Sequence, residues 1–305
     1  MRNPIVAIVG PTAVGKTHLS LEVARRFNVE IISVDSRQIY QHLDIGTAKP
    51  TIEDRSVVPH HLIDIADPKD DFSLATYLKM ARSVIEAVHN RGAIPLLVGG
   101  TGQYFRALVE NWQVPAVAPD WAFREKMNTF LLDHGVDALY ERLKAIDPMS
   151  AVAIDSKNSR RVIRALEVYE HTGTSFAKLR LRSDSKYTSL VVGVTTEREK
   201  LDSWIDLRVD HMIGLGWVRE VSNLLDLGVN GEHPSMSSVG YRELIEYVVG
   251  NTKLREAIKN IKTKTRRFAR RQYGWFSLSN PSIKWLESED EIVDRTIELL
   301  KNFVC

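Results

Sequence analysis

The sequence predicts an α/β fold, in which a parallel sheet flanked by helices carries a phosphate-binding loop (P-loop) and a helical insertion domain. The apolar run Ile5–Val9 precedes Gly10-Pro-Thr-Ala-Val-Gly-Lys-Thr17, and a helical pattern follows. Later apolar runs end at Asp35 and at the turn Gly99–Gly102. A stretch with only helical patterns then interrupts the α/β order. A strand, a glycine-rich loop and a helix in this sequence are typical of P-loop proteins.

The first half of the chain alternates strands and helices. We predict strands at residues 5–9, 31–34 and 94–98 and helices at residues 18–27 and 73–90, with Ser73 as the N-cap of the second helix. The strand at 31–34 ends at Asp35, and the strand at 94–98 ends at the Gly99–Gly102 turn. Because ligands collect at the carboxyl ends of parallel strands, Asp35 and this turn should lie beside the P-loop.

The second half begins with a helical insertion. Pro115 and Pro119 mark a linker, and helices are predicted at 123–134, 136–146 and 158–171. A strand returns at 190–194, and everything after it is predicted to be helical, including 201–213, 218–227 and 254–276. We therefore expect a core domain of residues 1–114 and 181–305 that surrounds an insertion domain of residues 115–180.

The composition is that of an ordinary globular protein. The chain has 305 residues, of which 44% are hydrophobic and 26% charged. Its one cysteine, Cys305, excludes an intramolecular disulfide and a cysteine-based zinc module and fits a reducing compartment. No apolar run approaches the roughly 18 residues that span a membrane. A cleavable signal peptide would remove the P-loop, so we expect a cytoplasmic protein that binds no membrane.

The P-loop offers the groups that a diphosphate or triphosphate requires. Backbone amides can surround the anion, Lys16 can reach its terminal phosphates, and Thr17 can hold Mg²⁺. The predicted anion-binding residues are Gly10, Thr12, Ala13, Val14, Gly15, Lys16 and Thr17. No acidic residue follows Leu96-Leu-Val98, where an ATPase commonly places its second magnesium-binding carboxylate. This departure indicates a phosphate ligand other than a triphosphate that is hydrolysed.

Asp35 and Thr101 are the other residues that could carry chemistry near the loop. Asp35 can bind Mg²⁺ through water, act as a general base, or cap the following turn. The donor-rich segment Ser36-Arg-Gln38 after it can line a pocket for a polar ring. Thr101 offers a hydroxyl within a glycine-rich turn, although a tight turn alone explains those glycines equally well. The adjacent His60 and His61 should point apart, which favours a structural or substrate-contact role over zinc.

Two basic segments allow either nucleic-acid binding or a solvated helix face. Residues 253–271 hold nine lysines and arginines against one acid, Glu256, and aromatic residues end the segment. These aromatics favour nucleic acid, while the competing interpretation is a buried aromatic terminus. Arg160, Arg161 and Arg164 lie together on a predicted helix and leave the same choice open.

Taken together, these motifs resemble the tRNA dimethylallyltransferases, also called tRNA isopentenyltransferases. The resemblance covers nearly the whole chain and rests on an ordered set of motifs. Besides the P-loop, the set comprises Asp35-Ser-Arg-Gln-Ile-Tyr40, Asp44-Ile-Gly-Thr-Ala-Lys-Pro50, His60-His-Leu-Ile-Asp64, Gly99-Gly-Thr-Gly102 with Tyr104, Arg160-Arg-Val-Ile-Arg-Ala-Leu-Glu-Val-Tyr169, Val239-Gly-Tyr-Arg-Glu243 and Thr265-Arg-Arg-Phe-Ala-Arg-Arg-Gln272. One departure is Gln103, where the family more usually has an apolar residue.

The resemblance implies transfer of a dimethylallyl group from dimethylallyl diphosphate to N6 of adenosine 37 of tRNA, with Mg²⁺ as cofactor. By the same resemblance Asp35 is the general base, and Thr101 and Arg208 act on the diphosphate. The implied contacts to the tRNA anticodon stem-loop are Asp35, Ser36, Arg37, Gln38, Arg124, Arg160, Arg161, Val162, Ile163, Arg164, Arg267 and Arg271. We expect the enzyme to act as a monomer.

Three alternatives remain at this point. A prenyltransferase of the same fold could act on free adenine nucleotides, but such a substrate needs no extended cationic surface. An ATP-dependent small-molecule kinase would use the same loop, and the missing carboxylate after Val98 argues against it. The third alternative is a non-catalytic RNA-binding protein, which would need the basic segments but would not need the chemistry of the P-loop.

Overall fold

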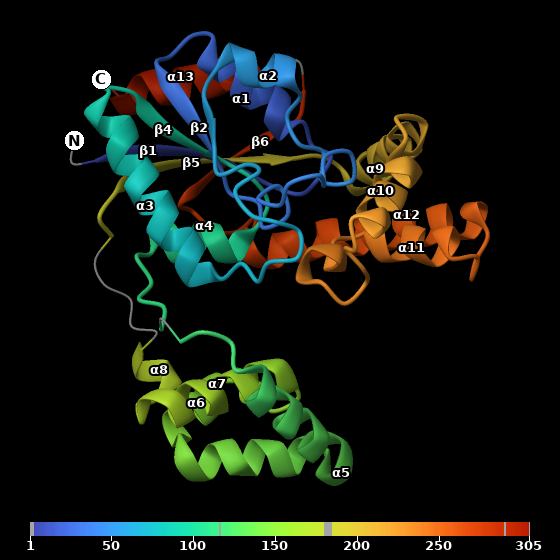
Figure 1. Cartoon of the computed structure of the whole chain (residues 1–305). Helices are drawn as coiled ribbons and strands as arrows, with labels where there is room; N and C mark the ends of the chain where they lie inside the picture. The colour runs from blue at the N-terminus through green and yellow to red at the C-terminus, as the bar shows by residue number, and fades with distance from the viewer. Residues whose placement is uncertain (1–2, 116, 180–184, 290, 305) are drawn as a thin grey trace. The chain divides into compact units, whose positions relative to one another are not determined.

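The structure is a computed structural model that describes residues 3–115, 117–179, 185–289 and 291–304 (Figure 1). It divides into a core unit, Met1–Val109 with Lys186–Cys305, and an insertion unit, Glu110–Ser185. The sequence predicts 115–180 for the insertion. Cys305 lies outside the described residues. None of the described helices combines the length and the hydropathy needed to cross a membrane.

The core unit is built on a parallel sheet, which confirms the predicted fold class. Its strands are β1 (Pro4–Val9), β2 (Val29–Ser33), β3 (His60–His61), β4 (Ile94–Val98), β5 (Thr188–Thr195) and β6 (Ile283–Glu287). In the described residues they form six strands in the order β3-β2-β4-β1-β5-β6, and each pairing is parallel. β1 lies in the middle of the order, so the P-loop that follows it is flanked by the ends of β4 and β5.

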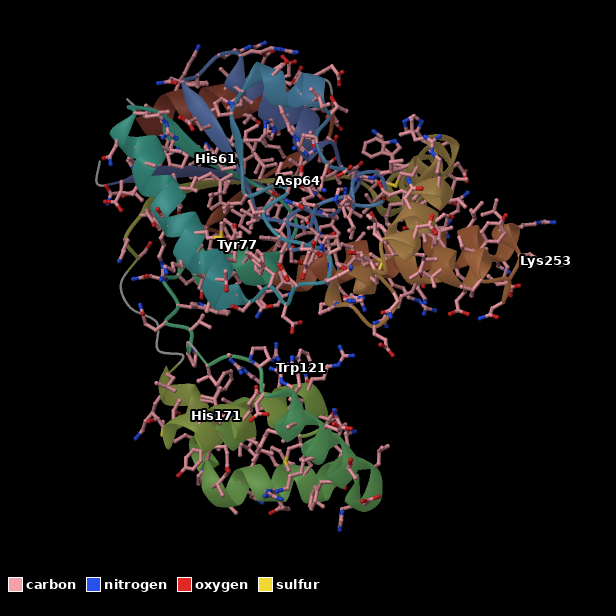
Figure 2. The ribbon with its side chains drawn as sticks, in the orientation of Figure 1. His61, Asp64, Tyr77, Trp121, His171 and Lys253 are labelled. Carbon is pink, nitrogen blue, oxygen red and sulfur yellow. The ribbon has the colours of Figure 1, made fainter. Side chains whose placement is uncertain are left out.

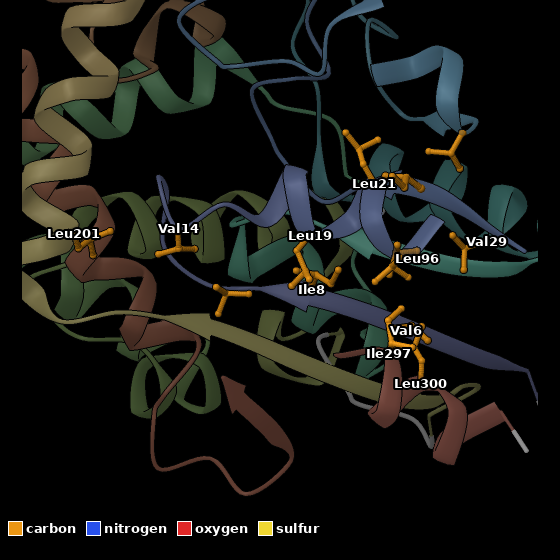
Figure 3. Packing of buried hydrophobic residues seen from close by; sticks show 14 of the residues in the cluster. Val6, Ile8, Val14, Leu19, Leu21, Val29, Leu96, Leu201, Ile297 and Leu300 are labelled. Carbon is orange, nitrogen blue, oxygen red and sulfur yellow. The ribbon is translucent and has the colours of Figure 1, made fainter. Parts of the chain in front are cut away.

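Helices cover both faces of this sheet (Figure 1). One face carries α1 (Lys16–Ala24) and α13 (Ile292–Val304), and the other carries α3 (Leu74–Asn90) and α4 (Gly102–Val109). Figure 3 shows Leu19 of α1 beside Ile8 and Leu300 of α13 beside Val6, both residues of β1, in one buried cluster. Each fully buried side chain of this kind contributes about 1.5–3 kcal/mol to folding. The hydrophobic contacts thereby fix the helix that the P-loop opens.

A second hydrophobic cluster supports the loop that follows β2. The helices around it are α9 (Arg198–Gly214), α10 (Trp217–Asp226), α11 (Tyr241–Val248) and α12 (Leu254–Trp275), while α2 (Ile52–Val57) and a short 3₁₀ helix (Pro234–Ser237) lie in the connections. Trp217 is buried between two glycines: a Cβ on either Gly46 or Gly240 would overlap its ring. Tyr241 packs edge-on against the same indole. This cluster holds residues 44–48 against the helices.

The insertion unit is helical, with its own core. It consists of α5 (Trp121–Ile146), α6 (Pro148–Ala153), α7 (Ser159–Thr172) and α8 (Phe176–Leu179). Gly135 has non-helical dihedral angles (φ 83°) within α5, at the junction between the two predicted helices. The helix predicted at 158–171 is confirmed as α7, with Asn158 as its N-cap and Gly173 ending it in the left-handed conformation.

The prediction of an all-helical segment after β5 is wrong at β6. Ile283–Glu287 pairs with β5 as an edge strand, and its residues are mostly exposed or half-buried. Because the strand is short and carries charged residues, it lacks the apolar run that identifies β1 and β4. Its packing is nevertheless specific, since a Cβ on Gly193 of β5 would lie 2.6 Å from side-chain atoms of Ile283 and Trp285.

We expect Gly46→Ala to destabilise the core unit, because the added methyl group would overlap Trp217. Overpacking of this kind costs about 1–3 kcal/mol. Gly214→Ala is the matched control, since Gly214 ends α9 and no atom lies within 4 Å of its Cβ position. Urea denaturation should show a lower midpoint for Gly46→Ala only. Equal midpoints for both variants would contradict the packing described here.

Candidate active site

A cavity of about 180 Å³ that opens to solvent lies at the carboxyl edge of the sheet. Lys16 and Thr17 of the P-loop line it together with Asp35, which follows β2. Arg208 of α9 and Gln272 of α12 complete the polar part of its wall. The structure therefore brings together the loop lysine, the loop threonine, the predicted base and the predicted diphosphate-binding arginine.

The shape of the P-loop depends on two glycines. Gly10 has φ 139°, and a Cβ there would overlap the backbone oxygen of Val194 in β5. Gly15 has φ 87° and forms the N-cap of α1. Both conformations are strained for any other residue. One predicted anion-binding amide is already occupied, because the N–H of Thr12 donates to Gln272 Oε1 at 2.8 Å.

The charges around the loop are arranged for an anion. Burial and, to a smaller extent, the neighbouring Arg208 lower the pKa of Lys16, Asp35 opposes both effects, and the resulting pKa is about 7. Burial also lowers the pKa of the Arg208 guanidinium, again opposed by Asp35. In the structure Lys16 Nζ donates to the carbonyl of Pro11 at 2.6 Å. A bound polyanion would stabilise the charged form of Lys16 and remove part of the repulsion between the two cations.

Asp35 both caps a turn and faces the cavity. Its Oδ1 accepts hydrogen bonds from the backbone N–H of Arg37 at 2.8 Å and of Gln38 at 3.4 Å. The capping that the sequence left as an alternative is therefore present, and it orients the carboxylate. With Oδ1 engaged in the turn, Oδ2 is the oxygen that can take a proton from a ligand in the cavity.

Thr101 connects the turn after β4 to the segment after β2. Its Oγ1 accepts from the N–H of Ser36 at 3.0 Å, and its own N–H donates to the carbonyl of Val34 at 3.1 Å. A Cβ on Gly99 would overlap that same Val34 carbonyl, which explains a glycine at this position. Thr101 is thus placed next to Asp35 through Ser36.

The side chains of Arg37 and Gln38 hold the protein's own backbone. Arg37 Nη1 donates to the carbonyl of Pro234 at 2.8 Å. Gln38 lines the cavity, where its Nε2 donates to the carbonyls of Thr47 at 3.2 Å and Ala48 at 3.1 Å. Predicted tRNA contacts by these two side chains would therefore either replace these internal hydrogen bonds or form while the bonds hold the side chains in place.

Two charged residues fix the neighbouring loop, and sequence analysis missed both. Lys49, whose side chain is 2% exposed, donates to Asp44 at 2.6 Å and to Asp64 at 2.5 Å. Glu220 of α10 accepts from the N–H groups of residues 44–46 at 2.9, 2.6 and 3.2 Å. Glu220 is far from this loop in sequence, so no local pattern could have identified it.

His60 and His61 point apart, as the sequence predicts. His60 lines the cavity, and its Nδ1 lies 2.8 Å from the carbonyl of Val58. His61, labelled in Figure 2, instead pairs with Glu30 at 2.6 Å. Gln103 is exposed and does not line the cavity. The departure from the family pattern at this position therefore lies outside the site.

The basic segment 253–271 forms most of α12, and part of its charge is neutralised within the protein. Lys262, Arg266 and Arg270 pair with Asp210, Asp206 and Asp202 of α9 respectively. Lys264 pairs with Glu243. Arg267 and Arg271 are exposed, and neither makes an ion pair within the described ranges. Of the aromatic residues, Phe276 is buried, as the interpretation of a buried aromatic terminus expects, while Phe268 lines the cavity.

The arginines of the insertion unit are divided in the same way. Arg124 donates to Glu167 at 2.8 and 2.9 Å, and Arg164 donates to it at 2.5 Å. Burial raises the pKa of Glu167, but the hydrogen bonds from the two arginines outweigh it and lower the pKa. Glu167 of α7 is fully buried, and its ion pair with Arg124 holds α5 against α7, while its pair with Arg164 lies within α7. Arg160 and Arg161 are exposed.

Val162 and Ile163, two of the predicted tRNA contacts, have buried side chains. Both lie in the core of the insertion unit, where they pack with Met127 and Leu139. Their side chains therefore stabilise the helix that carries the exposed Arg160 and Arg161.

The fold and the cavity together define a P-loop protein whose site suits a phosphorylated ligand beside a carboxylate base. The family model for IPP transferase matches residues 38–279, and a model for isopentenyl transferase matches residues 3–59. The chain belongs to the IPP transferase family, a family of transferases, and the resemblance inferred from its motifs is confirmed.

Similar proteins cover nearly the whole chain. A tRNA dimethylallyltransferase of Roseiflexus sp. (strain RS-1) is 49% identical over 273 residues, 90% of each chain. That of Halalkalibacterium halodurans is 42% identical over 308 residues, 100% of this chain and 98% of the relative. The crystal structure of a tRNA isopentenylpyrophosphate transferase from Bacillus halodurans has a TM-score of 0.73 at 41% identity and covers 99% of this chain and 95% of its own.

A more distant structure has the same fold. A eukaryotic dimethylallyltransferase, described as acting on tRNA, has a TM-score of 0.80 at 26% identity. The match covers 99% of this chain and 79% of that one. The core of the fold is therefore retained at low sequence identity, which is expected where packing and close backbone contacts, more than individual surface residues, define the architecture.

The lowered pKa of Lys16 predicts proton uptake when inorganic diphosphate binds. A pKa of about 7 leaves Lys16 half charged at neutral pH in the free protein, and the anion should raise that pKa. Calorimetry in buffers of different ionisation enthalpy should therefore show uptake of about half a proton at pH 7, rising toward one by pH 8. Diphosphate affinity should weaken correspondingly as the pH rises above 7.

Lys16→Arg is the control for this measurement. Arginine keeps its charge throughout this range, so the remaining pH dependence of the variant reports the titration of diphosphate itself. If wild type and variant took up the same number of protons, Lys16 would not be the titrating group.

Proposed function

We propose that the protein transfers a dimethylallyl group from dimethylallyl diphosphate to N6 of adenosine 37 in the tRNA anticodon loop and releases diphosphate. One observation carries the proposal: a single cavity holds the cations Lys16 and Arg208 beside the carboxylate of Asp35. Membership in the IPP transferase family supports it, as do relatives named tRNA dimethylallyltransferase. We expect the enzyme to act as a monomer in the cytoplasm, where tRNA is available.

The acceptor needs a base. The lone pair of adenine N6 is delocalised into the ring, so N6 attacks more readily when its proton is removed as the new bond forms. In the proposed step N6 bonds to C1 of the dimethylallyl group, the C1–O bond breaks, and its electron pair leaves with the diphosphate. Oδ2 of Asp35 accepts the N6 proton, while Oδ1 stays bonded to the turn at Arg37 and Gln38.

The leaving diphosphate needs positive charge. Lys16 of α1 and Arg208 of α9 both line the cavity. The backbone amides at the start of α1 add their partial positive charge. Thr17 lines the same cavity, and its hydroxyl with diphosphate oxygens and water suits the oxygen ligands that Mg²⁺ prefers. When bound there, Mg²⁺ would supply further charge neutralisation of the diphosphate.

An RNA acceptor accounts for the cations that the fold leaves exposed. Arg267 and Arg271 lie one helical turn apart on α12, and each directly precedes a cavity-lining residue, Phe268 and Gln272 respectively. Phosphate contacts at these arginines would bring the anticodon loop to the cavity mouth. The target adenine must leave its stack to reach Asp35, and an aromatic side chain at the mouth offers a surface for it.

Label transfer tests the proposal. The protein is incubated with dimethylallyl diphosphate labelled in the prenyl group, or separately with γ-labelled ATP, and with tRNA or AMP as acceptor. We expect prenyl label in tRNA only. Asp35→Asn should lower the turnover by at least about a hundredfold, because it removes the base while keeping an oxygen for the turn. Its tRNA affinity should be unchanged. Label in AMP alone, or transfer of γ-phosphate, would overturn the proposal.

The salt dependence of tRNA binding tests the role of α12. Replacing Arg267 and Arg271 together by alanine should reduce the slope of log affinity against log salt by about 1.5, since two phosphate contacts are lost. Lys284→Ala with Lys301→Ala is the control, because it removes the same charge from exposed positions on β6 and α13. An equal reduction in both double variants would remove α12 from the specific interface.

A further inference from the structure

We propose that Gln272 is a positioning residue of the active site, whose amide group locks the P-loop to the turn that carries Thr101. The inference rests on the proposed function, since it concerns where the leaving diphosphate lies relative to the base. It assigns to Gln272 a role that neither charge pattern nor hydrophobic period indicates.

Both ends of the Gln272 amide bind backbone atoms of the site. Oε1 accepts from the N–H of Thr12 in the P-loop at 2.8 Å, and Nε2 donates to the carbonyl of Gly100 at 2.9 Å. The side chain is 4% exposed, so solvent does not compete for these bonds. A single buried amide therefore bridges two loops that follow different strands, β1 and β4.

Gly100 is required by this bridge. A Cβ at residue 100 would overlap Gln272 Nε2, whereas the next atom outside Gln272, the carbonyl oxygen of Gly10, would lie 3.5 Å away. Gly100 is not among the glycines with positive φ, so its backbone conformation alone does not demand glycine. The glycine at this position is explained by the close approach of Gln272.

The bridge extends to the base. Thr101 follows Gly100, and its hydroxyl accepts the N–H of Ser36, the residue after Asp35. A short chain of hydrogen and covalent bonds thus runs from Thr12 through Gln272, Gly100 and Thr101 to Asp35. The P-loop holds the leaving diphosphate, and Asp35 takes the proton of the acceptor. This series of bonds therefore sets the distance between the diphosphate site and the base.

Neither glutamate nor methionine would satisfy both partners of Gln272. Glutamate has no donor for the Gly100 carbonyl, and its charge would oppose an anion in the same cavity. Methionine has a similar length but offers neither a donor nor a strong acceptor. Gln272 also follows the exposed Arg271 directly on α12. The helix that would contact RNA is therefore the helix that orders the P-loop.

Steady-state kinetics of Gln272→Glu and Gln272→Met test the inference. We expect kcat per tRNA-binding site to fall at least about tenfold in both variants, while the tRNA Kd stays within about twofold of wild type. Gln103→Glu is the matched control, since Gln103 is exposed on α4 and does not line the cavity. A residue that only stabilised the fold would change Tm and leave kcat per folded site unaltered, and that result would overturn the inference.

A double-mutant cycle gives an independent test should either variant fold poorly. Gly100→Ala should lower kcat because the methyl group displaces Gln272. In a Gln272→Ala background the same change should cost nothing further, because the space is then vacant. Additive losses would overturn the inference. Absence of prenyl transfer by the wild type would instead refute the proposed function itself, and the inference with it.

Discussion

The active site depends on how closely backbone segments approach one another at the carboxyl edge of the sheet. Gly10 lies against the Val194 carbonyl, and Gly99 lies against that of Val34. A Cβ at either position would force the strands apart, so glycine here is a condition for bringing the ends of β1, β2, β4 and β5 together. The P-loop and Asp35 meet in one cavity, with Thr101 bonded to the neighbouring Ser36, because these contacts are tight.

The charged side chains fall into two groups: some form ion pairs within the protein, and others face the ligand. The aspartates of α9 at 202, 206 and 210 neutralise one side of α12, and Glu167 neutralises Arg124 and Arg164 in the insertion unit. These pairs fix helices to one another. The cations left over are Lys16 and Arg208 in the cavity and arginines such as Arg267 on the surface. A net charge of +2 conceals this division between internal pairs and ligand-facing groups.

The sequence was sufficient to predict those structural features that depend on interactions between residues close together in the chain. The apolar run of β4, the Ser73 cap of α3 and the P-loop were all predictable, because period, capping and glycine geometry act over a few residues. The same information could not identify Glu220, Gln272 or the aspartates of α9, whose partners are distant in the chain. Nor could it separate Arg164, which binds Glu167, from Arg160, which is exposed. Edge strand β6 was not predicted because Lys284 and Glu287 interrupt its short apolar pattern.

The central claim is that the P-loop stabilises a leaving group at carbon and transfers no phosphoryl group. Dimethylallyl diphosphate with oxygen-18 at the bridge between C1 and phosphorus tests it most directly. If N6 attacks C1, as proposed, the C1–O bond breaks, and mass spectrometry should find all of the heavy oxygen in the released diphosphate. Heavy oxygen retained in an organic product would mean cleavage at phosphorus and would contradict the account.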